Sequence, residues 1–429
     1  MTVCCFKLSA TLITDSSVHI GSGKRTGVIK HSLSFIPGTI IRGSIGNCLL
    51  RISSNENSSS ELLSSLFSEE PGKSSKIFFK HCYPLHLKCD NSRGVFLPVP
   101  RTLFKCQNRQ CGRLYNTFEP PLQCETCGKS VKAALGFKCD SCGEISSMPV
   151  SMKRISSTAI DRASNSAAIL ATTSATPTAT MNPQHVTDWV NEDKKGIERA
   201  TGNSNNDIIS SSLEDEEEKH GLLHTIETIE RGTKFALEIV LDSSCQPILD
   251  KVKSLLIRGL EDEGIGGSKS RGFGNVSIKD IKVQEITTES LERQAQSYYS
   301  NNNKSLSKFS VHLLSPLVVE NAGANLEPST LLEGARRAYS WCFKEGKPSL
   351  PDLVKLKQIF SYEVFGGWSL KEERNRRPAV SISSGSAFLF ECPSPTPVLG
   401  EALASLEYYS IGGYKSHGYG QVRVSVPYR

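Results

Sequence analysis

Two glycine-rich segments of one pattern, 146 residues apart, carry residue types suited to binding a nucleic-acid backbone. The first reads IGGSKSRGFGNV from Ile265, and the second reads IGGYKSHGYGQV from Ile411. Glycines let main-chain N–H groups approach a ligand, Lys and Arg attract phosphate, and aromatic rings can stack on bases. One such segment alone could be a hairpin turn, whereas two copies that share a lysine favour a role in binding nucleic acid. We predict RNA contacts from Gly266, Gly267, Lys269, Ser270, Arg271, Gly272, Phe273, Gly412, Gly413, Lys415, Ser416, His417, Gly418 and Tyr419.

Six cysteines between residues 106 and 142 have the spacing of metal ligands. They form three pairs, each followed by a glycine that can relieve the turn after the second thiolate: Cys106 with Cys111, Cys124 with Cys127, and Cys139 with Cys142. Tetrahedral zinc takes four thiolates, so we predict a structural zinc bound by four of these six. The second pair could join either the first or the third. The two cysteines left over are either idle or part of a second, incomplete site.

Composition and charge set broader limits. The 50 Lys and Arg residues against 44 Asp and Glu give a net charge of +6, which fits a nucleic-acid partner without requiring one. The N-terminus lacks the features of a signal peptide, and there is no apolar run of about 18 residues. We expect a soluble, cytoplasmic protein with no membrane partner, whose cysteines are metal-bound or buried. Eight are predicted to pack as small apolar side chains: Cys4, Cys5, Cys48, Cys82, Cys89, Cys245, Cys342 and Cys392.

The elements that position these residues are themselves duplicated. Residues 7–14 match residues 308–315 as strands, and residues 37–43 match residues 328–334 as helix starts. In the helix starts, Thr39 and Thr330 occupy the expected N-cap positions. Three matched elements in one order, the glycine-rich segments included, indicate an internal duplication.

Each copy reads as strand, helix, further strands, helix and closing strand. This pattern predicts an α+β fold of two ferredoxin-like (RRM-like) domains, with helices on one face of an antiparallel sheet. We expect domains at residues 1–296 and 308–429. The first contains two insertions: a zinc-binding segment at 104–146 and a low-complexity loop at 165–220, which includes an acidic run at 214–218.

Several motifs together resemble the RAMP superfamily of CRISPR-associated proteins. They include HIGSG from His19, FIPGTIIRG from Phe35, Ile160-Asp161-Arg162 and both glycine-rich segments. LPVP from Leu97, FGGW from Phe365 and GSAFLF from Gly385 are similar to the large two-RAMP subunit of subtype III-D effector complexes. The resemblance covers most of the chain outside the low-complexity loop.

The resemblance implies a structural subunit of a type III RNA-guided interference complex, which binds CRISPR RNA along its backbone near the 5′ repeat-derived tag. The implied partners are CRISPR RNA, a polymerase-like large subunit, backbone RAMP subunits and, through the guide, target RNA. Holding a guide without reading its bases suits backbone amides and basic side chains. Further predicted RNA contacts are Gly21, Ser22, Gly23, Lys24, Arg25, Lys30, His31 and Arg42, although Arg42 could instead pair with an acid.

Catalysis is less strongly indicated. Backbone subunits of the family cut target RNA with an aspartate between the HIGSG and FIPG motifs, but the segment 24–34 contains no acid here. The alternative is a metal-independent RNase that processes repeat RNA with a histidine base, for which His19, His31 and His417 are the candidates. A zinc-bearing RNA-binding protein or RNase outside any CRISPR system is a rival interpretation. Two further basic features stay ambiguous: Asp161–Arg162 as a structural ion pair, and residues 374–377 as a solvated loop or phosphate patch.

Overall fold

The computed structural model describes residues 2–26, 29–53, 75–89, 94–158, 160–161, 166–167, 223–300, 306–319, 325–366, 368–369, 374–375 and 379–425. Nearly all of the low-complexity loop predicted at 165–220, together with its acidic run, lies outside these residues, as do Arg162 and Arg376–Arg377. The chain divides into two compact units, one of residues 1–24, 30–154 and 226–429, and one of residues 25–29 and 155–225. No helix among the described residues is long and apolar enough to span a membrane.

The first repeat has the ferredoxin-like arrangement that the sequence predicts. Its elements are β1 (Val3–Thr14), α1 (Gly38–Ser53), β4 (Ile77–Phe79) with β5 (Tyr83–His86), β16 (Lys234–Asp242), α4 (Leu249–Glu261) and β17 (Val276–Thr287). Strand β1 pairs antiparallel with β16 on one side and β17 on the other, and β4 and β5 both pair with β16. The spatial order of the four strand positions is therefore second, third, first, fourth.

The second repeat has the same topology. Its elements are β18 (Lys308–Leu313), α6 (Pro328–Phe343), β19 (Val354–Ile359), β24 (Ala387–Glu391), α7 (Pro397–Tyr409) and β25 (Val422–Ser425), and its sheet has the order β19-β24-β18-β25. This again places the strands second, third, first, fourth, all antiparallel. The predicted α+β fold with two ferredoxin-like repeats is confirmed.

The hydrogen-bond register corrects two details of the predicted duplication. Val276 of β17 pairs with Thr14, whereas the equivalent Val422 of β25 pairs with Leu313, so Thr14 corresponds to Leu313 and not to Ser315. The two-residue shift keeps the same side chains facing the core because strand side chains alternate with a period of two. Neither threonine is an N-cap: α1 begins at Gly38 and α6 at Pro328, a position where the fixed φ of proline starts the helix. Thr39 and Thr330 lie inside the first turns.

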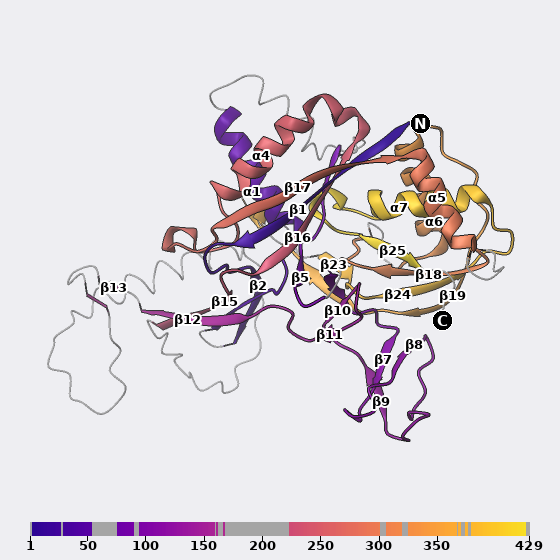
Figure 1. Cartoon of the computed structure of the whole chain (residues 1–429), viewed down its shortest axis with the longest axis horizontal. Helices are drawn as coiled ribbons and strands as arrows, with labels where there is room; N and C mark the ends of the chain where they lie inside the picture. Colours follow the sequence, from indigo (N-terminus) through magenta and orange to yellow (C-terminus); the bar gives the residue numbers. More distant parts are fainter. Residues whose placement is uncertain are drawn as a thin grey trace, which may run out of the picture. The chain divides into compact units, whose positions relative to one another are not determined.

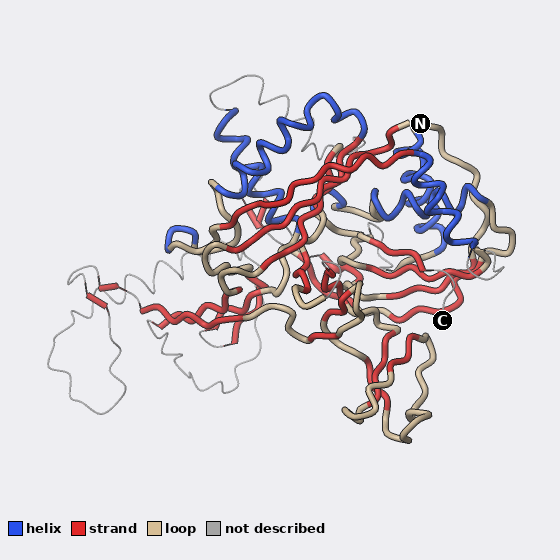
Figure 2. Tube along the Cα trace, viewed as in Figure 1, coloured by secondary structure: helices blue, strands red, loops and turns tan. Residues whose placement is uncertain are grey.

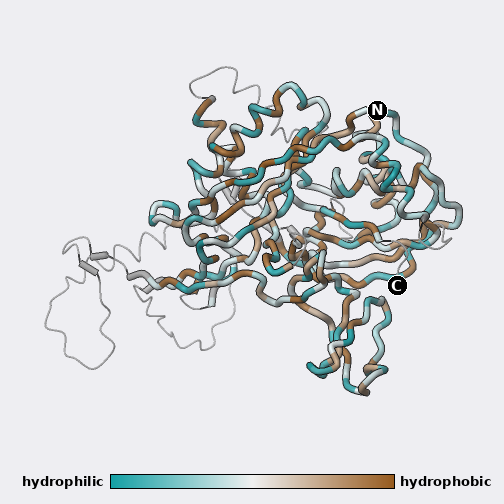
Figure 3. The backbone as a smooth tube through the Cα atoms, in the orientation of Figure 1, coloured by the Kyte–Doolittle hydropathy of each residue, from teal (hydrophilic) through white to brown (hydrophobic). Residues whose placement is uncertain are grey.

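Helices and sheets of the two repeats alternate in layers (Figure 2). The apolar sides of α1 and α4 pack on one face of the first sheet, through Ile45, Leu256 and Phe79 among others. The opposite face of that sheet packs on helices of the second repeat, where the Phe78 ring lies 5.4 Å from Trp341 and 5.5 Å from Tyr409. Hydrophobic stretches of the trace lie along these strands and helices (Figure 3). Because β4 is covered on both faces, its three residues Ile77, Phe78 and Phe79 are all apolar and buried.

The helix between the repeats, α5 (Thr288–Ser300), packs against α7 of the second repeat. The Gln294 amide donates to Glu407 over 3.0 Å, and the Tyr299 hydroxyl donates to the carbonyl of Thr396 over 2.6 Å. The predicted limit of the first domain, residue 296, falls inside this helix.

The insertion of the first repeat adds strands to its sheet and builds a separate small sheet. Strands β6 (Gly94–Pro98), β10 (Phe137–Cys139) and β11 (Ile145–Ser146) continue the first sheet beyond β5. Strands β7 (Leu103–Cys106), β8 (Leu114–Asn116) and β9 (Val131–Ala133) form a three-stranded sheet of order β8-β7-β9 (Figure 1).

The remaining elements are short. Strands β2 (Gly21–Thr26), β3 (Ile29–Ser32), β12 (Met152–Thr158) and β15 (Leu223–Ile229) form a sheet of order β12-β15-β3-β2. Three two-stranded pairs are β13 (Ile160–Asp161) with β14 (Ser166–Ala167), β20 (Tyr362–Phe365) with β23 (Ala379–Ile382), and β21 (Trp368–Ser369) with β22 (Arg374–Asn375). Short 3₁₀ helices are η1 (Ser243–Ile248), η2 (Lys269–Arg271) and η3 (Lys415–His417).

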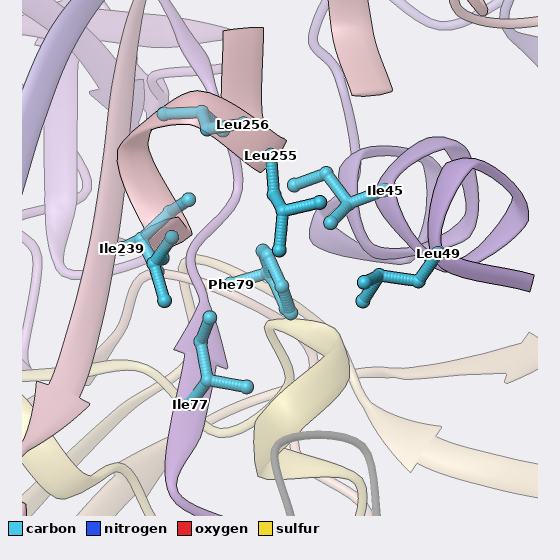
Figure 4. Close-up of a pocket in the computed structure, with 8 residues that line it drawn as sticks. Ile45, Leu49, Ile77, Phe79, Ile239, Leu255 and Leu256 are labelled. Atoms are coloured by element: carbon cyan, nitrogen blue, oxygen red, sulfur yellow. The ribbon is translucent and has the colours of Figure 1, made fainter. Parts of the chain in front are cut away.

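A small pocket lies where α1, α4, β4 and β16 meet. Its lining is entirely apolar, and the labelled side chains point toward one another from these elements (Figure 4). Its volume of about 10 Å³ is at the lower limit for a single water molecule. An apolar space of this size is a packing imperfection and not a binding site for a substrate.

Candidate nucleic-acid interface and metal centres

The two glycine-rich segments fold into loops with the same backbone. Each has a left-handed residue, a short 3₁₀ helix and a left-handed glycine: Ser268, η2 and Gly272 in the first loop, and Tyr414, η3 and Gly418 in the second. The φ angles are similar at equivalent positions: 60° at Ser268 and 53° at Tyr414, and 82° at Gly272 and 93° at Gly418. The sequence duplication is therefore a duplication of backbone conformation, including at two positions where the chain has no glycine.

Each loop sits on the segment that follows the first strand of its repeat. The N–H of Gly267 donates to the carbonyl of His19 over 2.9 Å, and the N–H of Gly413 donates to that of Val318 over 2.9 Å. A Cβ atom added at Gly266 or at Gly412 would lie 2.4 Å from the same two carbonyl oxygens. Glycine is required there both by this close approach and by φ angles of 77° and 78°.

The first loop is exposed along its whole tip, whereas in the second loop Gly412 and Tyr414 are exposed but the residues after Lys415 are not. Lys269, Ser270, Arg271 and Gly272 are all exposed, and Phe273 is half-buried. Two main-chain hydrogen bonds fix the backbone that carries these side chains. One runs from the N–H of Gly267 to the carbonyl of His19, and the other from the N–H of Gly274 to the carbonyl of Ser17. The loop presents two cationic groups on a rigid base.

The second loop is instead packed against the first repeat. Ser416 and His417 are buried, and a Cβ added at Gly418 would lie 2.5 Å from Nδ1 of His81. The ring of Tyr419 contacts His81 edge-on at 5.9 Å, and Nζ of Lys415 lies 3.6 Å above the ring of Tyr409. The prediction that Ser416, His417 and Gly418 contact RNA does not fit their burial. Sequence similarity between the loops could not reveal this difference because it depends on which surface each loop meets.

Glu227 of β15 joins the two histidines of the first repeat. Its main-chain carbonyl accepts from Nδ1 of His19 over 2.8 Å, which leaves the buried His19 ring between Gly21 and Gly267. Its carboxylate accepts from the N–H of Ser32 over 3.2 Å and lies 3.4 Å from Nδ1 of His31. Glu227 could not be singled out before the fold was known, since it lies about 200 residues from both histidines along the chain.

The other candidates near this loop occupy β2, β3 and α1. Gly21, Gly23 and Lys24 are exposed in β2, while Ser22 is half-buried and donates to the carbonyl of His31 over 3.0 Å. Lys30 and His31 are half-buried in β3, and Arg42 is half-buried in α1. Arg25 belongs to β2, but its side chain lies outside the described residues. The segment 24–34, which contains no Asp or Glu, therefore contributes to the two neighbouring strands β2 and β3.

Four of the six paired cysteines form one cluster. The sulfurs of Cys106, Cys111, Cys124 and Cys127 all lie within 4.8 Å of one another, with Cys106 and Cys127 3.3 Å apart. The Tyr115 hydroxyl donates to the sulfur of Cys124 over 3.3 Å and lowers the pKa of that thiol to about 6. The glycines after each pair, Gly112, Gly128 and Gly143, have positive φ, as predicted. Of the two predicted pairings, the structure contains the first pair with the second.

The third pair belongs to a second cluster, one of the two alternatives left open by the sequence, and the residues that complete this cluster were not predicted. Cys139 and Cys142 gather with His86 and Cys89, and Nδ1 of His86 lies 3.1 Å from the sulfur of Cys89 and 3.3 Å from that of Cys142. The other nitrogen of His86 lies 3.3 Å from Glu144, an orientation typical of a metal-bound histidine. The prediction that Cys89 packs as an apolar side chain is wrong. The other seven cysteines of that group are buried, as predicted.

Both clusters fit a tetrahedral metal ion. The first cluster offers four cysteine sulfurs, and the second offers three cysteine sulfurs and one histidine nitrogen, which are sets of ligands that zinc prefers. Gly94 leaves the room for the second cluster, since a Cβ there would lie 2.4 Å from the sulfur of Cys139 and 2.9 Å from that of Cys89. The spacing His86-x₂-Cys89 repeats that of the second and third cysteine pairs and is the signal that could have identified the second site.

The segment between the first two cysteine pairs contacts the second repeat. Phe118 is buried and packs on Ala387 and Leu389 of β24, on the sheet face opposite α6 and α7. Glu119 forms an ion pair with Lys357 of β19. The loop between the cysteines of the first cluster therefore rests on the sheet of the second repeat.

Comparison with known proteins adds a family. A family model described as "RAMP superfamily" matches residues 11–277. A stretch of 65 residues is 38% identical to the CRISPR system Cms endoribonuclease Csm3 of Methanothermobacter thermautotrophicus and covers 15% of this chain and 26% of that protein. The chain thus spans about a quarter of the length of the curated relative it matches.

Solved structures with similarity include Cas6 proteins. The chain aligns with a Cas6 of Thermus thermophilus at 11% identity and a TM-score of 0.29, over 45% of this chain and 75% of that one. A Cas6 product complex aligns at 10% identity and a TM-score of 0.37, over 98% of this chain and 100% of that one.

Proposed function

The chain belongs to the RAMP superfamily, and on this premise we propose that it is a CRISPR RNA-binding structural subunit of a type III RNA-guided interference complex, of subtype III-D. The observation that carries the proposal is the exposed first glycine-rich loop. Lys269 and Arg271 extend from a backbone that is fixed on His19 and has main-chain N–H groups nearby. Such a surface binds phosphates without reading bases, as a subunit that accepts guides of different sequence requires.

The proposed RNA contacts centre on the first repeat. They comprise the first loop together with Lys24 of β2, Lys30 and His31 of β3, and Arg42 of α1, while Arg25 stays a prediction from the sequence. The second loop contributes indirectly, by fixing the second repeat on the first. The expected neighbours are the 5′ repeat-derived tag of the guide, a polymerase-like large subunit and backbone RAMP subunits, and target RNA is reached through the guide.

A role in holding RNA is favoured over a role in cutting it. The segment 24–34 has no carboxylate, and His19 and His417 are buried, with exposed fractions of 8% and 4%. We also propose that each of the two clusters binds one structural zinc ion, because closed sites of four cysteine or histidine donors leave no position open for a substrate.

The double variant Lys269→Gln/Arg271→Gln tests the proposal. Affinity of the purified chain for a guide-length single-stranded RNA of random sequence is measured across a salt series. Each phosphate contact contributes about 0.7 to the slope of log K against log salt, so loss of two contacts should reduce the slope by about 1.4 and weaken binding for all sequences alike.

The matched control is Lys253→Gln/Lys347→Gln, which removes the same charge from lysines that already pair with Asp250 and Glu333. It should bind RNA as the wild type does. If the loop variant and the control give the same slope as the wild type, the assignment of the first loop is wrong. If the wild type does not bind RNA at all, the proposed function is wrong.

The second candidate function, a metal-independent RNase, has one observation in its favour. His31 retains an exposed fraction of 28% and has Glu227 3.4 Å from its ring, a pair that could serve as a general base. Cleavage of repeat RNA by the isolated chain, abolished in His31→Ala and retained in His19→Gln, would support the RNase and contradict the structural role. Guide RNA that co-purifies intact would support the structural role.

A further inference from the structure

The small sheet β8-β7-β9 has two faces of different character. The face with Cys106 and Tyr115 carries the first metal cluster. On the opposite face, Lys105 of β7 lies directly across from Lys132 of β9 and from Leu114 of β8. Continuation of the same register places Gln107 beside Ser130, whose carbonyl accepts from the N–H of Gln107 over 3.0 Å. We call these five residues, Lys105, Gln107, Leu114, Ser130 and Lys132, the lysine face.

Two lysines directly opposite each other in an antiparallel pair repel and weaken the sheet. Their Cα atoms are about 5.5 Å apart in a hydrogen-bonded pair. Both side chains are exposed, and neither forms an ion pair with any residue in the described part of the chain. The fold therefore keeps an unfavourable charge pair on a small sheet of three short strands.

The acids of this module cannot neutralise the pair because all of them are engaged elsewhere. Residues 101–146 contain four carboxylates. Glu119 and Glu125 form ion pairs with Lys357 and Arg113. Glu144 lies 3.3 Å from Nε2 of His86, and Asp140 accepts from the N–H of Val95 over 2.8 Å. Exposed Arg109 and Lys129, near the same sheet, likewise have no ion pair among the described residues. The unpaired charge of the module is therefore positive, and two of its cations, Lys105 and Lys132, lie directly opposite each other.

We propose that the lysine face binds the phosphate backbone of single-stranded RNA. The inference rests on the proposed function, since it adds a second contact surface for the same kind of ligand. Phosphate between the two ammonium groups would remove their repulsion, and the exposed Gln107 and Ser130 supply neutral donors beside them for phosphate or 2′-hydroxyl oxygens. The thiolates of the metal cluster lie on the other face, so their negative charge does not oppose RNA here.

The double variant Lys105→Gln/Lys132→Gln removes the charge and keeps long polar side chains. Affinity of the full chain for a random-sequence single-stranded RNA is measured across a salt series, with Lys253→Gln/Lys347→Gln as the control. Loss of two phosphate contacts should lower the salt slope by about 1.4, independently of RNA sequence. Metal content per chain should equal that of the wild type, and the urea midpoint should be equal or higher because the lysine repulsion is gone.

A second readout locates the contact directly. RNA that contains 4-thiouridine is photo-crosslinked to the wild type, and crosslinked peptides are identified by mass spectrometry. Peptides covering β7 or β9 support the proposal. Crosslinks confined to the first glycine-rich loop, with an unchanged slope for the lysine variant, overturn it and leave the proposed function intact. If the lysine variant binds RNA normally but no longer joins its protein partners, the face is a protein-docking surface and the proposal is wrong.

Discussion

At the scale of single residues, the room for a metal ion in the second cluster depends on a residue that is not itself a candidate ligand. Gly94 begins β6 and lies against the sulfurs of Cys139 and Cys89. The cysteine pairs could be predicted from their spacing because two ligands from one tight turn have a local signature. The second set could not be completed in that way, because His86 and Cys89 come from the end of β5, and pairing of β5, β6 and β10 brings them to Cys139. Such ligand sets depend on sheet register.

The variant Gly94→Ala tests the need for this space. Its Cβ would overlap two ligand sulfurs, so we expect metal content to fall from two ions per chain to one, measured by elemental analysis of the purified protein. Gly346→Ala is the control, because its Cβ would meet no atom within 4 Å. Retention of two ions in Gly94→Ala would show that the second cluster is not a metal site of the expected geometry.

At the scale of elements, the order of strands and helices could be predicted because the duplicated motifs fix the order in each copy. Whether each glycine-rich loop is exposed or buried could not be predicted. Both loops have one backbone, but the second meets Phe79 and His81 of the first repeat whereas the first loop is exposed. The insertion is a similar case. Its cysteines predict a small module held together by a metal ion, but nothing in the local sequence indicates that Phe118 packs on β24.

The packing of the insertion on the second repeat can be measured with Phe118→Ala. Removing a buried phenyl ring should lower the free energy of unfolding by about 3 kcal/mol, measured by urea denaturation. Leu122→Ala is the matched control from the same module, because Leu122 is 91% exposed and its truncation should change stability by less than about 0.5 kcal/mol. Equal stability of the two variants would mean that the module does not rest on β24 in solution.

At the scale of the whole molecule, the two repeats are joined by a buried ammonium group. Nζ of Lys80, in the segment after β4, donates to the carbonyl of Tyr408 over 2.9 Å and to the hydroxyl of Ser410 over 2.8 Å. These acceptors lie at the C-terminus of α7, where the helix dipole favours a cation. The side chain is only 4% exposed, and burial lowers the pKa of Lys80 to about 8. A charged group is thus retained inside the contact between the repeats.

Lys80→Met should therefore change both stability and its pH dependence. At pH 7 the variant leaves buried acceptors at the end of α7 without a donor, which should cost about 1–3 kcal/mol. Between pH 8 and about 10.5 the native wild type has lost the Lys80 proton while the unfolded chain keeps it, so this group raises wild-type stability with pH, by up to about 1.4 kcal/mol per unit.

The variant lacks this gain, so the difference in unfolding free energy between the two proteins should widen from pH 8 to pH 10 in urea titrations. Lys253→Met controls for loss of a lysine, since Lys253 pairs with the exposed Asp250 in α4. A difference between wild type and Lys80→Met that stays constant over this range would mean that Lys80 keeps an ordinary pKa and that water reaches the contact between the repeats.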